Sequence, residues 1–247
     1  MQALLSSTYF GPVQWYQKLC RHERVFVERY DSYRKQTYRN RCVIAAANGP
    51  QTLTVPVERQ AGGQRLLTRD VRISDHGNWR HQHWHALMSA YSESPFFDYY
   101  ADDLRPFFER RWEFLYDFNE AIRATLCELL DIHPDVRPTT HYVGNEELRM
   151  KNEEYVHQAQ GNGNIEGGDG AARGSSLAIR NSSYQTQNSK FISDFRDAID
   201  PKHPEPDPDF KPRPYYQVFQ ARHGFIPNLS VLDLLFNMGP EGIFWLL

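Results

Sequence analysis

The sequence of 247 residues is poor in cysteine and has no long apolar run. Its three cysteines, Cys20, Cys42 and Cys127, lie far apart and form no CxxC pair, which excludes a disulfide framework and a thiolate zinc site. No stretch approaches the roughly 20 apolar residues that a membrane span requires, and the first residues lack the basic segment of a signal peptide. We therefore expect a soluble protein of the cytoplasm without a membrane span.

The signatures of several enzyme classes are also missing. There is no GxSxG nucleophile motif, no Walker glycine loop and no HExxH motif. The formal net charge of −3 gives no electrostatic attraction for nucleic acid, so we expect no nucleic-acid partner. Hydrophobic residues nevertheless make up 40% of the chain and aromatic residues 14%, which predicts one domain with a substantial core over residues 1–247.

The hydrophobic pattern predicts an α/β fold, a mixed sheet with packed helices; an α+β fold is the alternative. A strand ending at Ser6, a helix from Gly11-Pro12 to about Leu19 and a strand over 25–30 form an N-terminal β-α-β unit. Asn48-Gly49 predicts a hairpin between its two flanking apolar runs. The remaining predicted elements are those runs at 35–46 and 51–57, an alternating strand around Val71 and Ile73, helices over 78–93, 102–116 and 117–131, and a returning strand over 215–219.

The last predicted helix spans 231–238. Ser230 is its expected N-cap, Asp233 completes a capping box, and Gly239 follows its C-terminus. Two other segments differ in composition. Residues 145–190, rich in Gly, Asn and Glu, are expected to form a flexible, loosely packed insert, and the proline-rich residues 201–214 an extended segment.

Three cations, Lys35, Arg39 and Arg41, are spaced so that they share one face of the first predicted hairpin strand. Such a face favours an anionic partner, because the planar guanidinium group of arginine binds carboxylate or phosphate through two hydrogen bonds. The alternative is a solvated face with ordinary ion pairs.

The segment WRHQHWH contains three histidines, His81, His83 and His85. A helical period places His81 and His85 together and His83 on the opposite flank, and no acidic third ligand follows at a diagnostic spacing, so we predict no metal site. A single histidine acting as an acid, a base or a substrate contact is favoured instead. Any of the three can equally be a packed side chain.

Several segments together resemble the WbqC-like family of bacterial proteins. The resemblance covers about residues 1–143 and 190–247 and omits the insert. The segments that carry it are LLSSTYFGPVQWYQKL, ERYDSYRKQTYRNRCVI, LTVPVE, WRHQHWHALMSAYSESPFFDYY, PYYQVF and GFIPNLSVLDLLFNMGPE.

This resemblance implies a role in O-antigen or related polysaccharide pathways, with modification of an amino sugar by transfer of an acyl or aminoacyl group. It implies no cofactor. The positions that match the polar pattern of the family are Asp31, Lys35, Asn40, Arg41, His83, Tyr91, Gln217, Asp233 and Asn237, although capping and helix-end roles explain the last two equally well.

Two functional hypotheses follow. In the first, a transferase acts on a small anionic, sugar-linked or carrier-linked substrate, with a carrier protein as a further candidate partner. His83 and Asp31 are its catalytic residues, His83 being the base and Asp31 the orienting group. The expected substrate-binding residues are Lys35, Asn40, Arg41, Tyr91 and Gln217. In the second, a non-catalytic protein binds a saccharide or a partner in an aromatic cleft. The oligomeric state stays open.

The first hypothesis makes a geometric prediction. The helix that carries His83 follows the hairpin directly, and the hairpin and strand 25–30 are expected to be neighbours in one sheet. His83 should therefore lie in one pocket with at least two of Asp31, Lys35 and Arg41.

Overall fold

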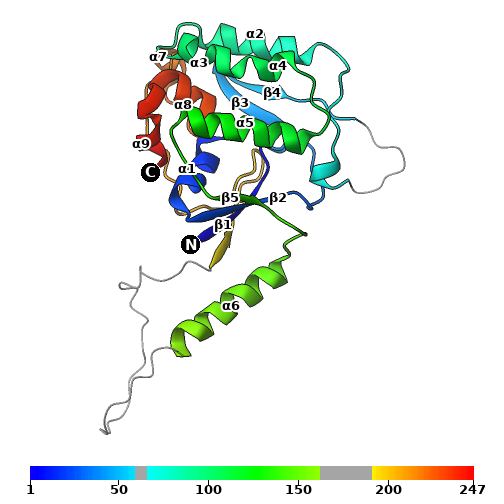
Figure 1. Ribbon diagram of the computed structural model, residues 1–247. Helices are drawn as coiled ribbons and strands as arrows, with labels where there is room; N and C mark the ends of the chain where they lie inside the picture. Colours follow the sequence, from blue (N-terminus) through cyan, green and yellow to red (C-terminus); the bar gives the residue numbers. More distant parts are fainter. Residues whose placement is uncertain (59–65, 162–190) are drawn as a thin grey trace.

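The computed structural model describes residues 1–58, 66–161 and 191–247 (Figure 1). Among these residues the central element is a four-stranded sheet with the order β5-β2-β1-β6. Every pairing in it is parallel. Its strands are β1 (Gln2–Ser6), β2 (Arg24–Glu28), β5 (Val136–Pro138) and β6 (Ile192–Asp194).

Strand β1 has apolar contacts on both faces, as is typical of a parallel strand inside an α/β protein. Ala3 and Leu5 point into the large core, whereas Leu4 joins a smaller cluster with Val143 and Leu148. Helix α1 (Val13–Arg21) connects β1 to β2. The predicted β-α-β unit is therefore confirmed.

The predicted hairpin is also confirmed. Strands β3 (Arg41–Ala46) and β4 (Gly49–Thr54) pair in antiparallel fashion, with Ala46 opposite Gly49. The connecting residues are thus Ala47 and Asn48, and Gly49 takes a φ of +106°. The hairpin forms a separate two-stranded sheet, so the prediction that it and the strand over 25–30 are neighbours in one sheet is wrong.

Residues 35–40 form a loop and not the first half of a hairpin strand. Lys35 and Arg39 therefore do not share a strand face with Arg41, which is the first residue of β3. The hairpin signal at Asn48-Gly49 suggested that a strand extends back to residue 35, but hydrogen bonds of the polar side chains at 37, 39 and 40 hold residues 35–40 as a loop.

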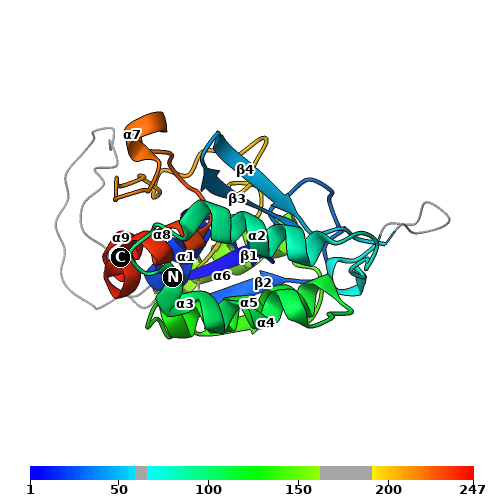
Figure 2. The same ribbon diagram turned by 90° about the horizontal axis from the view of Figure 1, so that it is seen from above.

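Four helices follow the hairpin in the chain: α2 (Trp79–Tyr91), α3 (Phe97–Leu104), α4 (Pro106–Glu109) and α5 (Leu115–Leu129). Figure 2 shows α2 between the hairpin on one side and α4 and α5 on the other. The single helix predicted over 102–116 is wrong. Helix α3 ends before Pro106, whose ring nitrogen lacks the proton that would continue the helical hydrogen bonds. Thr68–Asp70 form a 3-10 turn, and Val57 and Ile73 form only an isolated bridge.

Near the end of the chain, α8 (Val231–Met238) has the predicted bounds. The Ser230 hydroxyl accepts a hydrogen bond from the Leu232 amide at 3.3 Å, which confirms the N-cap. The capping box is wrong, because the Asp233 carboxylate accepts its hydrogen bonds from Tyr91, Tyr215 and Gln217. The other elements of this region are α7 (Gln220–His223), a 3-10 turn at Gly239–Gly242 and α9 (Ile243–Leu246).

No strand forms over 215–219, so that prediction is wrong. The strand that returns to the sheet is β6, which directly follows the expected insert of residues 145–190 and was not predicted. Residues 145–161, where no regular structure was expected, form helix α6 (Asn145–Gly161), which stands apart from the other helices in Figure 1. The rest of the expected insert, residues 162–190, lies outside the described residues. Residues 201–214 contain no helix or strand.

The α/β class is confirmed, in the form of a parallel sheet with a separate hairpin. Within the described parts of the chain, no helix has the length and apolar character needed to cross a membrane.

Candidate functional site

A pocket of about 780 Å³ lies where the strands of the parallel sheet end. Its walls come from the loop that follows β2, from the segment that follows β5 and from the residues directly after β6. The lining residues are Tyr30, Asp31, Ser32, Tyr33, Arg34, Arg39, Tyr142, Asn145, Arg196 and Asp197.

The order of the strands explains this position. From β1 the chain moves to β2 and then to β5 on one side, and it later returns to place β6 on the other side of β1. In parallel sheets, such a reversal opens a crevice at the carboxyl ends of the strands, and this crevice is where ligands bind. The loops that follow β2 and β6 border it.

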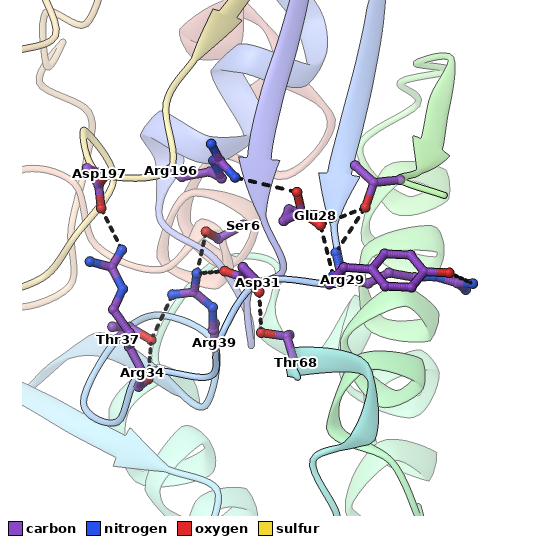
Figure 3. A network of polar contacts seen from close by, with 12 residues as sticks. Ser6, Glu28, Arg29, Asp31, Arg34, Thr37, Arg39, Thr68, Arg196 and Asp197 are labelled. Atoms are coloured by element: carbon purple, nitrogen blue, oxygen red, sulfur yellow. Dashed lines mark hydrogen bonds and ion pairs between the residues drawn. The ribbon is translucent and has the colours of Figure 1, made fainter. Parts of the chain in front are cut away.

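Asp31 and Arg39 form a buried ion pair at this pocket (Figure 3). The Arg39 side chain is only 3% exposed and also donates to the Ser6 hydroxyl at 2.9 Å. The Thr68 hydroxyl donates to the other carboxylate oxygen of Asp31. The carboxylate is thereby fixed in position by a cation and a hydroxyl.

A second network joins the segments that follow three strands. The fully buried Glu28 carboxylate accepts hydrogen bonds from the Tyr30 amide (2.8 Å), the Val143 amide (3.0 Å) and the Thr139 hydroxyl (2.8 Å). Arg196 contacts Glu28 at 3.4 Å (Figure 3). It also binds the Asp194 carboxylate at the end of β6. Glu28 therefore holds together the loops that form the pocket.

The rim of the pocket is more open. Arg34 donates to Asp197 at 2.6 Å, and both side chains are about half exposed, at 49% and 57%. Tyr142 is exposed as well, and the Arg196 guanidinium lies over its ring. The lining thus combines guanidinium groups, which bind phosphate and carboxylate, with tyrosine rings, which can stack on a sugar.

His83 lies elsewhere, so the geometric prediction is wrong. It is 5% exposed, one ring nitrogen is hydrogen-bonded to the Tyr9 hydroxyl at 2.8 Å, and its ring packs on Trp79. Burial lowers the pKa of His83 to about 4, although a hydrogen bond with the Thr54 backbone raises it in part. His83 is on the face of α2 that packs into the core and does not line the pocket.

The expected substrate-binding residues are also dispersed. Tyr91 and Gln217 are buried and donate to Asp233, while Asn40 is buried and donates to the Val55 carbonyl at 2.9 Å. Lys35 is exposed on the loop and does not line the pocket. Arg41 is half-buried at the start of β3, close enough to Tyr33 to affect its pKa.

Of the predicted catalytic residues, only Asp31 lines the pocket. Sequence reasoning missed the residues that the second half of the sheet contributes, Tyr142, Arg196 and Asp197. The strand predicted over 25–30 puts Asp31 just after a strand, and the structure has Asp31 in the loop that follows β2. The apolar pair Phe191-Ile192 before Ser193-Asp194 was the available signal for β6, but two residues are too few for a periodic pattern.

Within the ranges that the structure describes, no group of three or more His, Cys, Asp or Glu side chains is placed to hold a metal ion. A model of the WbqC-like protein family matches residues 7–194. No curated protein and no solved structure matches the chain.

Proposed function

The chain belongs to the WbqC-like protein family, and from this premise and the pocket we propose that it is a transferase of bacterial surface-polysaccharide synthesis. It binds an amino sugar on an anionic carrier, such as a nucleoside diphosphate, and transfers an acyl or aminoacyl group to the sugar amine. The reaction takes place in the cytoplasm, in an O-antigen-like pathway.

One observation carries the proposal. A carboxylate held by a buried arginine, Asp31 with Arg39, faces a pocket at the carboxyl ends of parallel strands. This position is where α/β proteins bind substrates. The arginines of the lining suit the anionic carrier, and the tyrosines suit the sugar ring.

In the proposed reaction the amine attacks the carbonyl carbon of an acyl thioester. The new bond is N–C, the broken bond is C–S, and the thiolate leaves. Asp31 accepts the proton that the amine loses and passes it to the leaving thiolate. A carboxylate has about four acceptor positions, and the bonds from Arg39 and Thr68 occupy two of them. Asp31 thus replaces His83 as the proposed base, because His83 lies outside the pocket.

The alternative is a saccharide-binding protein without catalytic activity. It is favoured by the fact that both Asp31 oxygens already accept hydrogen bonds. The lining of the pocket, as far as the chain is described, also contains no histidine or cysteine.

The test uses Asp31→Asn with a panel of UDP-linked amino sugars and acetyl-coenzyme A. Binding of the sugar is measured by calorimetry and N-acetylated product by mass spectrometry. Removal of a proton acceptor typically costs about a hundredfold or more in rate, so product formation should fall by that factor while sugar affinity stays within about twofold.

A second variant separates binding from folding. Arg34→Gln removes an exposed rim cation and should weaken sugar binding, whereas Arg105→Gln removes an equally exposed arginine, paired with Glu109 at 2.6 Å outside this pocket, and should not. Saturable sugar binding without product in the wild type supports the binding protein. Unchanged sugar binding in Arg34→Gln contradicts the assignment of the pocket.

A further inference from the structure

Three side chains within residues 33–41, which run from the loop after β2 to the first residue of β3, carry buried donor atoms without a hydrogen-bond partner among the described residues. They are the Tyr33 hydroxyl, the Arg39 Nε and the Arg41 Nε. A buried donor that bonds to nothing costs roughly 1–3 kcal/mol, so native proteins seldom keep several of them in one place without a use.

Both arginines lie close enough to Tyr33 for their charges to act on its hydroxyl, and the three residues are called a cluster here in that sense. Burial raises the pKa of the Tyr33 hydroxyl to about 12, and the nearby charges of Arg39 and Arg41 lower it in part. The hydroxyl therefore stays protonated at neutral pH and is available as a donor. Tyr33 and Arg39 both line the pocket, so the cluster reaches the pocket wall through these two residues.

Other buried donors without a partner have different surroundings. The Tyr116 hydroxyl on α5 is one of them, but it lies among charges of both signs, Glu120 and Asp117 with Arg29 and Arg123. It is not part of the pocket lining. Tyr116 therefore provides a matched control for Tyr33.

The charge of the cluster points to an anion. Asp31 neutralises Arg39, whereas no carboxylate in the described parts of the chain lies within ion-pair distance of Arg41, although its side chain is half-buried. A half-buried guanidinium without a counter-charge is unfavourable by itself and is stabilised by a bound anion.

We infer that Tyr33, Arg39 and Arg41 form an oxyanion subsite that holds one phosphate or carboxylate group of the ligand. The inference rests on the proposed function and deepens it, because it names the group by which the substrate is recognised. The Tyr33 amide donates to the Leu66 carbonyl at 2.8 Å, and the Tyr9 amide donates to the Tyr38 carbonyl at 2.8 Å, so the loop is fixed before the anion binds.

The experiment compares four probes by calorimetry: UDP, uridine, D-glucuronate and D-glucose. UDP should bind more tightly than uridine, or glucuronate more tightly than glucose. The anion with the larger gain in affinity over its neutral counterpart identifies phosphate or carboxylate as the group that the subsite binds. Because a hydrogen bond to a charged group is worth about ten- to a hundredfold in affinity, Tyr33→Phe should weaken the preferred anion at least about tenfold. Arg41→Gln should weaken it further, and Tyr116→Phe should leave it unchanged.

A second readout distinguishes this role from a structural one. Removing an unbonded donor or an unpaired charge costs the folded protein nothing, so Tyr33→Phe and Arg41→Gln should keep or raise the Tm of the free protein. A fall in Tm comparable to the loss of affinity would assign these side chains to folding. Equal affinity for UDP and uridine, with equal affinity for glucuronate and glucose, would overturn the subsite.

The outcomes also separate the subsite from the transferase. Anion binding that depends on Tyr33 and Arg41, with no product from any amino sugar, leaves the subsite standing and removes the proposed activity. Product formation with an unchanged KM in Tyr33→Phe and Arg41→Gln supports the transferase activity and contradicts the subsite.

Discussion

Asp233 is a buried carboxylate that is bonded to neutral donors alone. It is 1% exposed and accepts hydrogen bonds from the Tyr91 hydroxyl (2.9 Å), the Tyr215 hydroxyl (2.8 Å) and the Gln217 amide (2.8 Å). Burial raises the pKa of Asp233 from 3.8 to about 6, although the three hydrogen bonds partly oppose the shift. The side chain that was expected to complete a capping box, and that matches the polar pattern of the family, is therefore buried in the core.

This pKa predicts how stability depends on pH. Between pH 3.8 and about 6 the folded protein holds a proton on Asp233 that the unfolded chain has lost, so the free energy of unfolding falls as pH rises through this window. The contribution is present at low pH and is lost above about pH 6, and it amounts to about 3 kcal/mol.

Urea unfolding of the wild type and of Asp233→Asn at pH 4, 5, 6 and 7 checks this prediction. The variant cannot titrate here, so its stability relative to the wild type should rise steadily across the series. A difference that is independent of pH would show that Asp233 does not titrate in this window.

For single residues, the sequence indicated which polar side chains have a specific function in the fold, but it often did not indicate what that function is. Asp31 was expected near the site and does line the pocket, because a polar residue directly after a buried strand must lie at the edge of the sheet. Tyr91 and Gln217 were expected there too, yet both bind Asp233. Their partner lies 142 and 16 residues away, and no local pattern reports such a contact.

Helix α8 shows what a local signal can predict about an element. Its bounds were correct because the Ser230 cap and Gly239 are properties of adjacent residues. The absent strand at 215–219 had only its aromatic and β-branched composition as a signal, and such composition reflects burial as much as strand pairing. Here Tyr215 and Gln217 are indeed buried, but in a segment that joins no sheet.

Gly239 gives a prediction at the same scale. Its φ is +57°, and a Cβ atom at this position would come within 2.7 Å of the Phe96 ring. Gly239→Ala should therefore lower the free energy of unfolding by at least about 2 kcal/mol, since backbone strain and overpacking add.

Gly77→Ala is the matched control for this substitution. The φ of Gly77 is also positive, at +78°, but nothing lies within 4 Å of the added Cβ. Gly77→Ala should therefore lower the free energy of unfolding by the backbone strain alone, about 1 kcal/mol. Equal losses for the two variants in urea unfolding would mean that the Phe96 contact is relieved without cost.

On the scale of the whole molecule, the elements were easier to predict than their assembly. The β-α-β unit and the hairpin arise from neighbouring residues, whereas the sheet that contains the pocket needs β5 and β6, from residues 136–138 and 192–194. The opposite side of the pocket comes from Arg196 and Asp197, more than 150 residues after Asp31. Because these parts of the site come from distant segments of the chain, the sequence predicted the loop after β2 but not the rest of the pocket.

The proline-rich residues 201–214 show the same kind of long-range dependence. Asp207 lies in this segment, and its side chain is 3% exposed because it contacts Lys18 of α1 at 2.7 Å, a lysine that is fully buried. Gln14 of the same helix also donates to Asp207 at 2.8 Å. The Lys18 ammonium group lies over the Phe195 ring as well, so a segment without helix or strand is attached to the core by one buried charge pair.

Removing one partner of this pair should be costly, because the other charge then stays buried without compensation. Asp207→Asn is expected to lower the free energy of unfolding by about 3–5 kcal/mol, while Asp209→Asn, an exposed carboxylate two residues later, should change it by less than about 0.5 kcal/mol. Lys18→Met combined with Asp207→Leu should recover most of the loss, since apolar side chains of similar volume replace both charges. Urea unfolding of the wild type and of these three variants measures each free energy of unfolding. A double variant that is no more stable than Asp207→Asn would show that the hydrogen bonds of Asp207, and not its charge, hold the segment in place.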